Sequence, residues 1–143
     1  MPRYSIRYRS LLLPILAVII LEIIWNLLEG FLDPSLLDIP LHLVKYVLYA
    51  IAGYIAALLD LDYIHGAIYG GITGGVGALV EGFIISLLFY GVFFYTPGFS
   101  LFFALEHIIN LILTGAFFGL IGSYLRSVTA LEPLAEFLRQ YIE

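Results

Sequence analysis

Residues 66–82 read GAIYGGITGGVGALVEG, a segment in which a small residue returns at every fourth position. The repeating positions are Gly66, Gly70, Gly74, Ala78 and Gly82. In an α-helix this spacing keeps one small residue in each turn on the same face. Small residues on one face let two helix backbones approach closely, which is how helices associate in lipid. The segment therefore predicts a tightly packed transmembrane helix.

The composition of the whole chain is that of a membrane protein. Of its 143 residues, 62% are hydrophobic and 12% are charged, and the mean hydropathy is +1.05. In a soluble domain about a quarter of the residues are charged. A transmembrane helix needs about 20 mostly apolar residues, and the sequence offers four such segments. They cover roughly residues 10–31, 41–59, 63–93 and 99–125.

Turn-forming residues separate these segments. Asp33-Pro34-Ser35 through Pro40 predicts the first connection, and Tyr95-Thr96-Pro97-Gly98 the last one. The fold class predicted is all-α: a four-helix transmembrane bundle over residues 1–126, followed by a cytoplasmic tail over residues 127–143.

The tail predicts a short interfacial amphipathic helix. Thr129 followed by Glu132 forms a capping-box pattern. Apolar residues then recur at helical spacing, as expected for a helix that lies on a membrane surface. They are Leu131, Leu134, Leu138, Tyr141 and Ile142. The alternative is a frayed tail.

Further small residues predict the packing partners of the glycine-rich segment. Gly71 and Gly75 form a second row beside the first. The last apolar segment carries Gly115, Gly119 and Ser123, and the second carries Gly53 and Ala57. Such surfaces serve both contacts within one bundle and contacts between copies. The partners expected are therefore the lipid bilayer and either a second copy of the chain or other subunits of a membrane complex.

The basic residues predict the orientation of the bundle. Arg3, Arg7 and Arg9 precede the first segment, and Arg126 and Arg139 follow the last. By the positive-inside rule, a chain with four spans then has both termini in the cytoplasm, in the cell membrane. The net charge is −5, and no basic patch suited to nucleic acid is present. The scarcity of Asn, Gln, Met and Cys is a trait of hyperthermophile proteins.

Two stretches near opposite ends of the chain are alike. Residues 21–27 read LEIIWNL and residues 105–111 read LEHIINL, each with a glutamate four positions before an asparagine. One helical turn puts both polar side chains on the same face. Because the two helices run in opposite directions, the motifs fit an inverted repeat, an arrangement that carries binding sites in many secondary transporters. Coincidence is the alternative, since the remaining matches are common apolar residues.

Most intramembrane polar residues fall in the outer half of the bundle when depth is counted along the helices. A charged side chain at a helix centre costs about 2.5–3.5 kcal/mol, so such groups face a bundle interior, a polar cavity or each other. Lys45 is expected to reach the outer interface or to neutralise Glu29 or Asp38. The candidates for a substrate or ion pathway are Glu22, Asn26, Glu29, Lys45, Glu81, Glu106, His107, Asn110 and Thr114.

Three classes of function are compatible with these residues. In the first, they are interhelical glue in a structural or accessory subunit of a membrane assembly. In the second, carboxylates near a histidine relay protons or small cations through an oligomeric channel or transporter. An intramembrane enzyme has the least support, because Glu106-His107 lacks the His-Glu-x-x-His spacing of a metalloprotease. We expect no catalytic residues, cofactor or metal.

Overall fold

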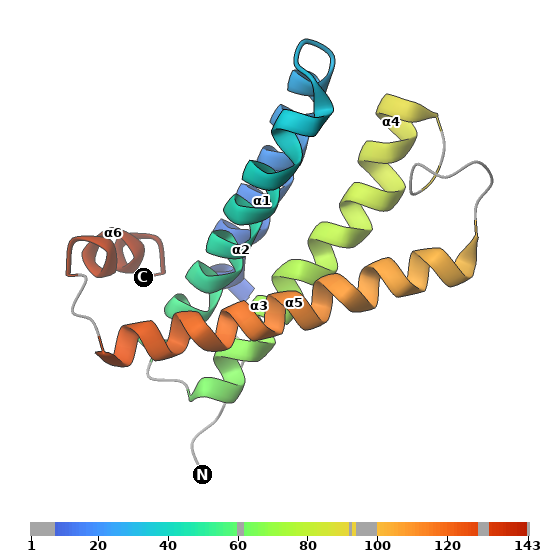
Figure 1. Cartoon of the computed structure of the whole chain (residues 1–143). Helices are drawn as coiled ribbons and strands as arrows, with labels where there is room; N and C mark the ends of the chain where they lie inside the picture. The colour runs from blue at the N-terminus through green and yellow to red at the C-terminus, as the bar shows by residue number, and fades with distance from the viewer. Residues whose placement is uncertain (1–7, 60–61, 92, 94–99, 129–131, 143) are drawn as a thin grey trace.

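The computed structural model describes residues 8–59, 62–91, 93, 100–128 and 132–142 (Figure 1). The described residues form helices joined by turns, with no strand among them. The elements are α1 (Tyr8–Glu29), α2 (Pro34–Leu58), α3 (Tyr63–Leu79), the π-helix η1 (Val80–Ile85), α4 (Ser86–Tyr90), α5 (Leu101–Val128) and α6 (Glu132–Ile142). The all-α class predicted from the sequence is confirmed.

Four helical stretches are long and apolar enough to cross a membrane. They are Arg9–Glu29, Ile39–Leu58, Tyr63–Tyr90 and Leu101–Val128. The third stretch runs through α3, η1 and α4 without a break. These lengths and compositions are those of a multi-pass membrane protein.

The start of α2 corrects one prediction. Residues 34–40 were expected to form a loop, but the helix begins at Pro34 and continues through Pro40. Asp33 is the N-cap, and its carboxylate accepts a hydrogen bond from the Ser35 backbone N–H. A proline at the first helical position suits a helix start, because its missing N–H would have no partner there. Asp-Pro-Ser therefore starts a helix here, although the same residues are common in turns.

A second N-cap begins α3. Asp62 Oδ1 accepts a hydrogen bond from the His65 backbone N–H at 2.9 Å. The same oxygen forms a second hydrogen bond with the His65 ring Nδ1 at 2.6 Å. These hydrogen bonds, that of the backbone N–H first, lower the pKa of Asp62. At the other end of this span, Gly91 has a φ of 69° and ends α4 in the left-handed conformation that glycine adopts without strain.

The glycine rows lie where α2, α3 and α5 meet. A Cβ added at Gly119 of α5 would lie 2.9 Å from the Gly70 Cα of α3, and one at Gly115 would lie 2.9 Å from the Gly70 carbonyl carbon. On α2, a Cβ at Gly53 would fall against Gly119. Ser123 of α5 also donates a hydrogen bond to the Gly53 carbonyl at 2.9 Å. The three backbones are thus in direct contact, which only glycine permits at these positions.

The two ends of the bundle are packed differently. Around the α2–α3 turn, Leu11, Ile55 and Tyr69 belong to one buried apolar core that also includes Leu138 of α6. Toward the α1–α2 turn, the α1–α2 pair, α4 and the beginning of α5 diverge (Figure 1). The closely packed half is called the α2–α3 end below, and the divergent half the α1–α2 end.

The tail forms a helix that folds back onto the bundle. Ala135 and Leu138 of α6 are fully or almost fully buried, whereas Glu136 and Phe137 are exposed. The guanidinium Nη1 of Arg126, near the end of α5, lies 3.7 Å from the carboxylate Oε1 of Glu132 at the start of α6. The predicted cap Thr129 lies outside the described residues.

Candidate functional site

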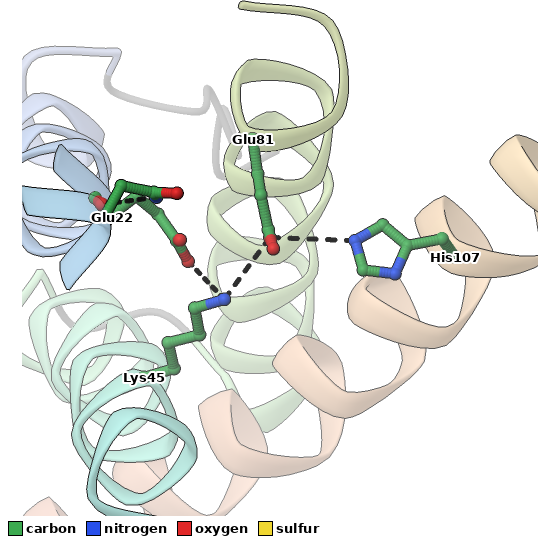
Figure 2. Close-up of polar contacts among 5 residues, drawn as sticks. Glu22, Lys45, Glu81 and His107 are labelled. Carbon is green, nitrogen blue, oxygen red and sulfur yellow. Dashed lines mark hydrogen bonds and ion pairs between the residues drawn. The ribbon is translucent and has the colours of Figure 1, made fainter. Parts of the chain in front are cut away.

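A buried lysine joins two carboxylates from different helices. Lys45 of α2 forms an ion pair with Glu22 of α1, and its Nζ lies 3.2 Å from Glu81 Oε2 of η1 (Figure 2). The side chains of Lys45 and Glu22 are 4% and 3% exposed. The sequence had suggested that Lys45 reaches the interface or neutralises Glu29 or Asp38. Its side chain is instead enclosed and paired with Glu22 and Glu81, and the side chain of Asp38 lies outside the described residues. Lys45 lies between two acidic groups in the interior, where buried charges are normally paired.

His107 extends this arrangement to a fourth helical segment. Its Nε2 lies 3.6 Å from Glu81 Oε2, on the side of the carboxylate away from α1 (Figure 2). The His107 side chain is 40% exposed, whereas the lysine is enclosed. Glu22, Lys45, Glu81 and His107 are called the charged cluster below. It connects α1, α2, η1 and α5 at one point.

The π-helix positions the central carboxylate of this cluster. Glu81 is the second residue of η1, and the buried Gly82 follows it. A π-helical turn is wider than an α-helical turn and so changes which residues face the neighbouring helices. Short π-helical segments occur frequently at functional sites. Here the irregular turn carries the acidic group that contacts both Lys45 and His107.

Tyr49 lies one turn after Lys45 on α2 and is completely buried. Its hydroxyl has no hydrogen-bond partner among the described residues. A buried hydroxyl without a partner costs free energy, so such a group calls for an explanation. Sequence reasoning missed Tyr49, although its spacing of four from Lys45 was a usable signal.

A cavity of about 580 Å³ lies between α1, the start of α2 and the η1–α4 segment. Its polar lining comes from Glu22, Asn26, Glu29 and Glu81, and its apolar lining includes Trp25, Leu41, Ile85, Phe89 and Tyr90. The Tyr90 hydroxyl donates a hydrogen bond to Glu29, which links α4 to the end of α1. The carboxylates of Glu22 and Glu81 belong both to this cavity and to the charged cluster.

The structure brings together six of the nine pathway candidates. Glu22, Asn26, Glu29 and Glu81 line the cavity, and Lys45 and His107 contact its acidic groups. The Asn26 side chain donates a hydrogen bond to the Glu22 carbonyl at 2.8 Å, within α1.

The other three candidates lie on α5 away from the cavity. Glu106 and Asn110 are exposed, and Thr114 is half-buried. The two Glu-x-x-x-Asn motifs therefore occupy different environments, because Glu22 is buried at 2% exposure while Glu106 is on the surface.

The aromatic lining was also absent from the sequence-based candidates. Trp25, Phe89 and Tyr90 come from α1 and α4, and no spacing rule connects these two segments. Aromatic residues make up 16% of the chain, so an individual aromatic residue carries little signal. In the part of the chain that the structure describes, no group of three or more His, Asp and Glu side chains is arranged to hold a metal ion.

The fold and the site define a multi-pass helical membrane protein with a charged cavity. No family model, curated protein or solved structure matches this chain.

Proposed function

We propose that this protein binds a cation in the acidic cavity and carries protons or small cations across the membrane. The main support for this proposal is the balance of charges around the cavity. Three carboxylates line it, and two of them, Glu22 and Glu81, are already paired with the single lysine, Lys45. The excess of negative charge in a low-dielectric region attracts a positive ligand.

The packing beyond the charged cluster favours a transporter over an open pore. Tyr49, Ala52 and Ile55 follow Lys45 along α2 and are completely buried, as is Tyr69 on α3. The cavity therefore opens from the α1–α2 end and is closed by packed side chains toward the α2–α3 end. Passage requires the helices to change their arrangement, as in alternating access.

The charged cluster supplies a device that couples binding to this change. A cation that reaches Glu22 or Glu81 competes with Lys45 for the same oxygens. His107 Nε2 lies 3.6 Å from Glu81 Oε2 and offers this carboxylate a further partner. Exchange of partners among these four residues alters contacts on α1, α2, η1 and α5 together.

Flux measurements in liposomes test this proposal. We expect the purified protein to move protons or monovalent cations, and Glu81→Gln to reduce the flux at least about tenfold while the protein remains folded. Glu136→Gln is the matched control, because Glu136 is exposed on α6 and far along the chain from the cavity. Absence of flux in the wild-type protein, or equal flux in both variants, contradicts the proposal.

A second candidate function, as a structural subunit of a membrane assembly, is favoured by the surface of α5. Glu106 and Asn110 are exposed within the span Leu101–Val128. Facing lipid, a carboxylate at this depth costs up to about 2.5–3.5 kcal/mol. A second copy related by a two-fold axis along the membrane normal presents the same two residues at the same depth. Reciprocal hydrogen bonds between Glu106 of one copy and Asn110 of the other satisfy both groups.

The oligomeric state in lipid nanodiscs tests this second candidate. We expect a dimer for the wild-type protein and a monomer for Asn110→Leu, with Leu88→Ala at an exposed position of α4 as control. A monomeric wild-type protein excludes this interface.

A further inference from the structure

The α1 face of the cavity alternates acidic and aromatic groups. Glu22, Trp25 and Glu29 are separated by three and four positions, so they lie on one face of the helix, and all three line the cavity. Trp25 thus lies between the two carboxylates along the helix axis. A carboxylate beside an aromatic ring is a chemical environment that attracts positively charged ligands.

The opposite wall adds two further aromatic rings. Phe89 and Tyr90 of α4 line the same cavity, and Leu41 and Ile85 complete its apolar lining. The hydrogen bond from Tyr90 to Glu29 holds this carboxylate at the α4 side. Cations are drawn to the faces of such rings, most strongly to that of tryptophan.

The size and lining of the cavity distinguish between classes of cation. A bare metal cation prefers a shell of oxygen ligands at short distance, whereas most of the residues lining this cavity are apolar or aromatic. The volume of about 580 Å³ lies within the range of about 300–1,000 Å³ that is typical of small-molecule sites. Both features fit a ligand that carries a charged nitrogen and an apolar body.

We propose that the ligand of this cavity is a small organic ammonium compound, bound between Trp25 and Glu29. This inference rests on the proposed cation-binding function and names its ligand class. Lys45 contacts the Glu22 and Glu81 carboxylates of the cavity, and its charge repels a second cation there. The ammonium group therefore binds nearer the α1–α2 end, where Glu29 has no basic partner among the described residues.

The single tryptophan provides a direct readout of binding. Trp25 is the only tryptophan in the chain, so fluorescence excited at wavelengths where the 11 tyrosines do not absorb reports on this cavity. Protein in nanodiscs is titrated with choline chloride at constant ionic strength. Parallel titrations use sodium chloride and the uncharged alcohol in which carbon replaces the choline nitrogen. We expect a saturable fluorescence change with choline and none with the other two compounds.

Variants connect the signal to the proposed residues. We expect Glu29→Gln to weaken choline binding about tenfold, measured by fluorescence and by calorimetry, and Glu136→Gln to leave it unchanged. Tyr90→Phe keeps the ring and removes the hydrogen bond from the hydroxyl to Glu29, so it should also weaken binding. It serves as the second test if Glu29→Gln does not fold.

The outcomes separate this inference from the proposed function. An equal response to choline and its uncharged analogue overturns it, because the cavity would then select shape without charge. Sodium or proton flux that depends on Glu81, together with no choline binding, overturns the ligand class and leaves cation transport intact. Choline binding that depends on Glu29, without flux of any cation, supports the ligand class and contradicts transport.

Discussion

Lys45 Nζ of α2 lies 3.2 Å from Glu81 Oε2 of η1, although 36 positions separate the two residues in the chain. The same nitrogen is paired with Glu22 of α1. One ammonium group thus connects three helical segments through carboxylates that line the cavity. The free energy of this arrangement depends on all three charges being present, because a buried charge without its partner is costly.

Replacing Lys45 should therefore destabilise the protein strongly. In Lys45→Met, two carboxylates remain in the interior without a cation, and we expect a loss of about 3–5 kcal/mol in the free energy of unfolding. Denaturation in mild detergent measures this loss. The triple variant that adds Glu22→Gln and Glu81→Gln has no uncompensated charge and should recover most of the stability. A single variant as stable as the wild-type protein would show that the lysine is not needed to compensate these carboxylates.

The contact between α3 and α5 should not accept a side chain. In Gly70→Leu, the new Cβ would lie 2.8 Å from the Gly119 Cα before the rest of the leucine is placed. We expect a loss of about 1–3 kcal/mol or more, or failure to fold. Leu88→Ala changes a residue of α4 that is 75% exposed and should have little effect. Equal thermal stability of the two variants would be inconsistent with a close contact at Gly70.

The N-cap of α3 should make stability depend on acid pH. Hydrogen bonds from His65 lower the pKa of Asp62 below its unfolded value of about 3.9. A carboxyl group with a lowered folded pKa stabilises the folded state above the unfolded pKa, and this contribution is lost as the pH falls through the folded pKa. We expect melting temperatures below about pH 4 to fall more steeply for the wild-type protein than for Asp62→Asn. Parallel curves would indicate that Asp62 does not contribute.

The orientation of the bundle can be tested by labelling. With both termini in the cytoplasm, a cysteine at Val128 should react only from the cytoplasmic side, and one at Asp33 only from outside. The chain contains no cysteine, so the background is zero. Labelling of position 128 by an impermeant reagent added to intact cells would contradict this orientation. The α1–α2 end and its cavity would then face the cytoplasm.

Several parts of the fold could be predicted from local sequence. The lengths of the apolar segments identified the four helices capable of spanning a membrane, because hydropathy and length are local properties. The limits of α2 were harder to predict, since Asp33-Pro34-Ser35 starts a helix as readily as it forms a turn.

The residues that form the site could be predicted only in part from the sequence. Glu22, Lys45 and Glu81 were recognised as candidates because charged residues are rare within apolar segments. The pairing of these residues could not be predicted. The helices α1, which carries Glu22, and α5, which carries His107, are apolar on nearly every side, so their sequences do not indicate which face is buried. The same ambiguity left Glu106 and Asn110 grouped with Glu22, from which the structure separates them.

The sequence by itself determined the helical class and the polar residues available to a site, because composition and spacing act within a single helix. Only the tertiary structure decided which of those residues meet. The rotation of each helix about its own axis is set by contacts between helices, such as those of Gly70 with Gly115 and Gly119. That rotation directs Glu22 inward against Lys45 and leaves Glu106 on the surface.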